Sequence, residues 1–134
     1  MGARLGAGLS LAGLTLQVLL AALAVSVLSS PQSGPGLGAI IGLIILIGFG
    51  VLFLYIPSMI LFLAAAISAR GVYSPVTGAV FTASGILHLI TSILVLSTAS
   101  LQNIPSLTTA AVAAIAGVAL LVYGLRRLRH PQRT

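Results

Sequence analysis

Four long apolar runs dominate this sequence, and almost no charged residue lies inside them. They cover approximately residues 5–28, 37–68, 76–98 and 107–125. A transmembrane α-helix needs about 20 consecutive, mostly apolar residues, because the hydrocarbon core of a bilayer is about 30 Å thick. Each run meets this length. The chain is therefore expected to be an all-α integral membrane protein, a four-transmembrane-helix bundle that forms one polytopic domain over residues 1–134.

The composition agrees with this interpretation and excludes several kinds of active site. Hydrophobic residues make up 59% of the chain and charged residues only 4%, whereas soluble domains carry about 25% charged residues. Asp, Glu and Cys are absent. The chain alone therefore cannot form a carboxylate pair, a Ser-His-Asp triad or a cysteine-ligated metal site. We expect no enzyme activity, no catalytic residue and no metal.

All formal charge comes from arginines that flank the apolar runs. They are Arg4, Arg70, Arg126, Arg127, Arg129 and Arg133. One precedes the first run, one follows the second and four follow the fourth, so four crossings bring all of them to the same side of the membrane. The positive-inside rule predicts that this side, with both termini, is cytoplasmic. The four arginines in the basic tail over residues 126–134 are expected to contact lipid head groups or an acidic partner. Arginines at helix ends do not form the basic face that nucleic acid requires.

The second run is too long for one straight crossing and contains a proline. Its length of about 32 residues corresponds to about 48 Å of helix. Pro57 removes a backbone hydrogen bond and clashes with the preceding turn, so we predict a kink near Pro57. The carbonyl of Phe53 loses its donor and is expected to bond to Ser58 or to a neighbouring helix. The helix could instead begin outside the hydrocarbon core, and the proline could serve packing or a gating hinge.

Small residues recur at helical spacing in all four runs. Membrane helices place such residues at their contacts because small side chains let two backbones approach closely. The packing residues that we predict are Gly13, Gly38, Gly42, Ser84, Gly85 and Gly117. In the third run the helical period predicts a buried face of Thr77, Phe81, Ser84, Gly85, His88, Thr91 and Ser92. The opposite face, which includes Val80, Ile86, Ile90 and Ile93, is expected to contact lipid.

Two strongly polar side chains lie within the runs, Gln17 in the first and His88 in the third. Each lies about 12 residues from the start of its run, so both are expected at a similar depth in the bilayer. A polar group without a partner costs several kcal/mol in hydrocarbon. We therefore predict that Gln17 and His88 face the same interior and bond directly or through water. Replacement of His88 by leucine would then loosen the pairing of the first and third helices.

Four roles remain open for His88. It could be a polar group that joins helices through Ser84, Ser92 or Gln17. It could mark a proton or substrate path, although the absence of carboxylates weighs against proton coupling. It could ligate a haem, with Met59 as the only second ligand within the membrane. It could contact a quinone or a lipid head group. We expect no cofactor, and haem bound through His88 is the alternative.

Three classes of function are compatible with these features. The first is a non-catalytic accessory or structural subunit of a larger membrane complex, held by small-residue helix packing, with the bilayer, other subunits or further copies as partners. The second is a small oligomeric transporter or channel with a path near Gln17, Pro57 and His88. The third is a haem- or quinone-binding subunit that uses His88. The chain lacks Cys and Lys and has a single asparagine, Asn103. From this composition we expect a prokaryotic cytoplasmic membrane as its location.

Overall fold

The computed structural model describes residues 2–29, 41–42, 44–98 and 104–129, and this part of the chain is helical apart from one short connection. Its elements are α1 (Gly2–Ser29), η1 (Ile45–Tyr55), α3 (Ile56–Ser68), α4 (Pro75–Thr98) and α5 (Ile104–Arg129). Four helical segments are long and apolar enough to cross a membrane, namely Gly2–Ser26, Gly48–Ser68, Pro75–Ser97 and Leu107–Arg129. This confirms the all-α architecture with four candidate spans. The side of the membrane on which each end lies stays a prediction.

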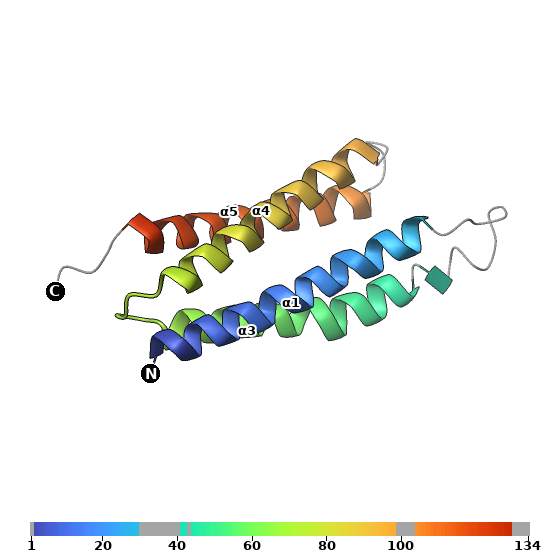
Figure 1. Cartoon of the computed structure of the whole chain (residues 1–134). Coiled ribbons are helices and arrows are strands. Elements are labelled where there is room, and N and C mark those ends of the chain that lie inside the picture. Colours follow the sequence, from blue (N-terminus) through green and yellow to red (C-terminus); the bar gives the residue numbers. More distant parts are fainter. Residues whose placement is uncertain (1, 30–40, 43, 99–103, 130–134) are drawn as a thin grey trace.

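The helices are arranged as two hairpins that pack together. Figure 1 shows α1 beside η1 and α3, and α4 beside α5. The start of α1, the connection between α3 and α4 and the end of α5 lie at the same end of the bundle (Figure 1). A hydrogen bond of 2.9 Å from Arg127 Nη1 to the carbonyl of Val72 joins α5 to that connection. We call this end, which carries Arg4, Arg70 and Arg126–Arg129, the basic end.

The bundle presents large aliphatic side chains outward and small or polar ones inward. Ile67 and Ile115, for example, leave 66% and 71% of their surface exposed, whereas Ser10 and Thr77 are fully buried. Lipid chains are as apolar as leucine, so membrane helices gain more by placing small residues at their contacts than by burying large aliphatics. The outward aliphatic surface is therefore the lipid-facing surface of a membrane bundle.

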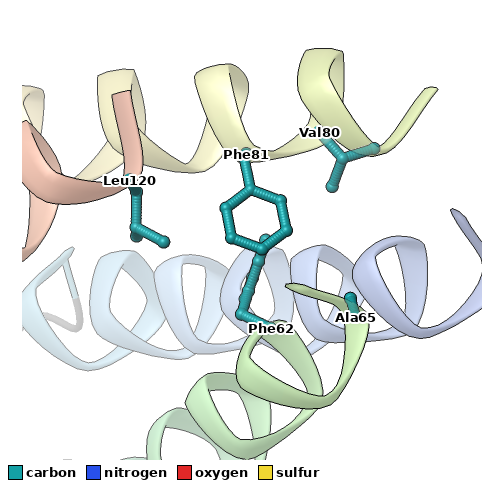
Figure 2. Close-up of a cluster of buried hydrophobic side chains, with 5 residues drawn as sticks. All are labelled: Phe62, Ala65, Val80, Phe81 and Leu120. Carbon is teal, nitrogen blue, oxygen red and sulfur yellow. The ribbon is translucent and has the colours of Figure 1, made fainter. Parts of the chain in front are cut away.

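An aromatic cluster joins three helices towards the basic end. The hydrophobic core consists of Phe62, Ala65, Val80, Phe81 and Leu120, from α3, α4 and α5 (Figure 2). Phe62 and Phe81 pack edge to face with ring centres 4.8 Å apart, and Phe81 packs against Tyr123 at 4.6 Å. Each such aromatic pair contributes about 0.5–1.5 kcal/mol beyond its buried area. The cluster therefore holds the two hairpins together through apolar contacts.

The buried face of α4 follows the predicted helical period with two differences. Thr91 is exposed, and its hydroxyl donates to the carbonyl of Leu87 at 2.8 Å. Because this bond stays within α4, the hydroxyl leaves no unpaired donor when it faces lipid. Val80, which was expected to face lipid, is only 6% exposed and belongs to the core. The predictions for Thr91 and Val80 were therefore wrong, because neighbouring helices cover the face of α4 unevenly along its length.

The second span begins as a π-helix and continues as an α-helix. The amide of Ile56 donates to the carbonyl of Val51, five residues back, where η1 joins α3. Pro57 follows at once and has no amide hydrogen, so it cannot extend an α-helical ladder backwards. The hydroxyl of Ser58 donates to the carbonyl of Tyr55 at 2.7 Å. Of the two partners expected for the carbonyl of Phe53, the Ser58 hydroxyl is therefore excluded, and a neighbouring helix stays a prediction. The kink near Pro57 stays a prediction.

Candidate functional site

Five residues in the middle of the bundle form a closed set of hydrogen bonds that we call the polar network. They are Gln17 of α1, Tyr55 of η1, Ser58 of α3, and Ser84 and His88 of α4. Ser58 and Ser84 are fully buried, and Gln17 and His88 are only 3% and 6% exposed. The network thus connects three of the four spans inside the bundle.

The first half of the polar network is built around the amide of Gln17. Its Oε1 accepts a short hydrogen bond from the hydroxyl of Ser84. Its Nε2 donates to Ser58 Oγ at 3.4 Å and lies 3.9 Å from Met59 Sδ. The hydroxyl of Ser58 in turn donates to the carbonyl of Tyr55. One amide side chain therefore joins α1 to both α3 and α4, using its acceptor and its donor group.

The second half of the polar network is built around the ring of His88. Nδ1 lies 2.8 Å from the carbonyl of Ser84, which can only accept, so Nδ1 carries the hydrogen. In the neutral ring, Nε2 then accepts from the hydroxyl of Tyr55 at 3.1 Å. The two rings pack at an angle of 52° with centres 5.6 Å apart. His88 therefore joins α4 to η1, and both of its nitrogens have partners.

Helical spacing explains why these groups meet. Ser84 and His88 are four residues apart on α4, and Tyr55 and Ser58 are three apart across the junction of η1 and α3, so each pair lies on one helix face. Gln17 lies on the buried face of α1 together with Ser10, Gly6 and Gly13. The polar residues of three spans are thereby directed towards a common interior.

The predicted pair of Gln17 and His88 faces the same interior, but Ser84 lies between them. Gln17 bonds to the hydroxyl of Ser84 and His88 to its carbonyl. Ser92, another partner considered for His88, bonds instead to the carbonyl of Ala110 at 2.9 Å. Tyr55 was missed altogether as a member of the site. Its place three residues before Ser58, midway along an apolar run, was the signal that could have identified it.

Two glycines of α4 face two glycines of α5, and we call these four residues the glycine interface. They are Gly78, Gly85, Gly117 and Gly124. A methyl group on Gly85 would lie 2.8 Å from the carbonyl oxygen of Gly117, and one on Gly124 would lie 2.7 Å from that of Gly78. Real Cβ atoms essentially never approach another atom closer than 3.0 Å. Only glycine fits at positions 85 and 124, because an added Cβ there would overlap the backbone of the facing helix.

The remaining predicted packing residues differ in what the structure shows. Gly13 faces Phe62, whose ring would lie 3.0 Å from an added Cβ. Ser84 belongs to the polar network, and Gly42 is half-buried. Gly38 lies outside the described residues. The sequence prediction found Gly85 and Gly117 but missed Gly78 and Gly124, although each pair repeats the same seven-residue spacing.

Two of the arginines at the basic end line a groove with a volume of about 360 Å³. It is lined by residues 71–74, Tyr123, Arg126 and Arg127. Arg127 Nε donates to the hydroxyl of Tyr123 at 3.0 Å, and its guanidinium lies 5.4 Å from the centre of that ring. Arg129 is exposed and does not line the groove. Arg133 lies outside the described residues.

The polar network is suited to holding helices together. Within the described residues every buried side-chain nitrogen and oxygen has a hydrogen-bond partner, and no three His, Cys, Asp or Glu residues gather there to hold a metal ion. Iron ligation by His88 would require Nε2 to leave the hydroxyl of Tyr55. The second haem ligand considered, Met59, contacts Gln17. The geometry therefore does not favour a haem site.

Comparison with known proteins identifies no relative of this chain. The search finds no matching family model, no matching curated protein and no matching solved structure. The function of this chain has therefore to be inferred from the contacts of its own residues.

Proposed function

We propose that this chain is a non-catalytic structural subunit of a larger membrane complex. The polar network carries the proposal. The buried groups that could bind a substrate or relay a proton, His88 and Gln17 above all, are bonded to Tyr55, Ser58 and Ser84. Polar groups that are saturated by one another hold helices in a fixed arrangement. Such an arrangement suits a subunit whose task is to present a rigid surface.

The outward face of α1 is a suitable surface for a partner helix. Gly8, Ala12 and Thr15 form an exposed strip of small residues between the larger Leu11 and Val18. Outside the backbone of α1 itself, no atom lies within 4 Å of the place where a Cβ of Gly8 would be. On α3, by contrast, the outward side chains are large, and Leu63 and Ile67 are 64% and 66% exposed. Small residues favour contact with another helix and large aliphatics favour lipid. Both observations support a partner subunit that packs against α1.

Native mass spectrometry of the chain, purified from its own membrane in mild detergent, tests this proposal. We expect a foreign membrane subunit to co-purify at fixed stoichiometry and to be lost in Gly8→Leu. The matched control is Gly48→Leu, because Gly48 also has no atom within 4 Å of an added Cβ but lies on η1. A lone chain, or copies of this chain only, would contradict the proposal.

One observation favours a small oligomeric transporter or channel as a second candidate. The π-helix η1 ends at Tyr55, which bonds to His88 next to Pro57, and π-helical turns occur frequently at functional sites. Solute or proton flux through liposomes that contain the purified chain, lost in His88→Ala, would favour this candidate. A haem absorption band that disappears in the same variant would favour the third class.

A further inference from the structure

The groove lies at the basic end of the bundle, beside the connection between the second and third candidate spans. Its loop residues 71–74 lie between the candidate spans that end at Ser68 and begin at Pro75. Tyr73 and Tyr123, whose rings prefer the boundary between hydrocarbon and water, both line it. A groove at the end of the spans favours contact with lipid head groups over contact with acyl chains.

One arginine of the groove is held in place and the other is exposed. Arg127 donates from Nε to Tyr123 and from Nη1 to the carbonyl of Val72. These bonds occupy two of the five N–H donors of its guanidinium. They also fix the direction of the group, so that less side-chain entropy is lost when a ligand binds. Arg126 is exposed on the same wall.

No carboxylate side chain of this protein can neutralise these two arginines, because the chain contains neither Asp nor Glu. No side-chain anion of this chain can therefore balance them. A guanidinium presents a planar fork of donors that matches the oxygens of a phosphate group, and paired arginines are a common means of phosphate recognition. The position of the groove makes a lipid phosphate the nearest such anion.

We propose that the groove binds the phosphate of one anionic membrane lipid. Arg127 contributes an oriented guanidinium, and Arg126 contributes a second positive charge from the exposed side. The rings of Tyr73 and Tyr123 cover the glycerol region of the lipid. This site does not depend on the proposed role as a subunit, because it needs only the α3–α4 connection and the end of α5.

The test is native mass spectrometry of the full chain in mild detergent, titrated with phosphatidylglycerol or phosphatidylcholine. We expect one tightly retained phosphatidylglycerol and no comparable phosphatidylcholine. Arg126→Gln should weaken the affinity about fivefold and Arg126→Gln/Arg127→Gln about twentyfold, from the attraction of each basic residue to anionic lipid. Since Arg126 is exposed, the single variant should keep the thermal unfolding temperature of the parent.

The matched control is Arg129→Gln, which removes a charge from the same end of α5 but outside the groove. We expect less than a twofold loss in this variant. An equal loss in Arg126→Gln and Arg129→Gln would show diffuse attraction and overturn the site. Displacement of the lipid by an equal concentration of inorganic phosphate would assign the groove to free phosphate and overturn the lipid assignment.

Discussion

The glycine interface and the polar network join helices of the same bundle by opposite means. Between α4 and α5 the backbones touch, because Gly78, Gly85, Gly117 and Gly124 have no side chains. Among α1, α3 and α4 the helices are connected by side chains that reach one another, with Gln17 at the centre. The glycine interface depends on the absence of side chains, and the polar network depends on the presence of hydrogen-bond donors and acceptors.

The glycine interface and the polar network tolerate different substitutions. An added Cβ at Gly85 or Gly124 would lie less than 3.0 Å from backbone atoms, which cannot rotate away as a flexible side chain can. An apolar replacement in the polar network fits the space but leaves its former partners without hydrogen bonds. Steric overlap in a packed core typically costs more than one lost interhelical hydrogen bond in a membrane. Substitutions at the glycine interface are therefore expected to lower the free energy of unfolding more than substitutions in the polar network.

The largest effect is expected for Gly124→Leu. Even the first carbon of the new side chain would lie 2.5 Å from the amide nitrogen of Thr82, so α4 and α5 have to separate. We expect a loss of about 3 kcal/mol or more in the free energy of unfolding, measured by denaturant titration in detergent micelles. Gly8→Leu, at an open position of α1, should change it by less than about 0.5 kcal/mol. Equal effects in the two variants would show that the backbones of α4 and α5 do not touch.

A smaller effect is expected for Gln17→Leu. The change removes an acceptor from Ser84 and a donor from Ser58, and interhelical hydrogen bonds in membranes contribute about 0.6 kcal/mol on average and up to about 1.7 kcal/mol. The same titration should show a loss of about 1.5 kcal/mol. Thr15→Val is the control, because the hydroxyl of Thr15 bonds within α1 and is exposed. A neutral outcome for Gln17→Leu would contradict the polar network.

The smallest effect is expected for Tyr55→Phe, which removes one hydroxyl and keeps the ring. We expect a loss of about 0.6 kcal/mol from the bond to His88. A double-mutant cycle with His88→Leu separates this bond from the other contacts of each residue. A coupling energy near zero would show that the two side chains do not interact. Because His88 bonds to η1, His88→Leu should loosen the second span from the third more than the first from the third.

The sequence predicted the number of candidate spans because bilayer thickness and hydropathy set it without reference to tertiary contacts. Helical period then placed Ser84, His88 and Gln17 on inward faces, and their burial follows from the cost of unpaired polar groups in hydrocarbon. The partners of these residues depend on how the two hairpins pack. Tyr55 was missed because its hydroxyl meets His88 only when the two hairpins pack together, with Tyr55 as the last residue of η1.

The groove was beyond sequence reasoning for a related reason. One of its walls comes from the connection after α3 and the other from the end of α5. These two segments are far apart in the sequence, and only the packing of the helices brings them together. The tail arginines were predicted as a group, but only the packing of Arg127 on Tyr123 and Val72 distinguishes it from Arg129. The sequence shows that arginines lie at the end of the helix, whereas the fold determines where each arginine side chain points.

The membership of the polar network also has a consequence for the order in which the chain assembles. All five of its residues lie between Gln17 and His88, and none belongs to α5. A growing chain thus contains the complete network as soon as its third span has been synthesised. The glycine interface, in contrast, forms only when the last span is added. At that point the first three spans already contain every residue of the polar network.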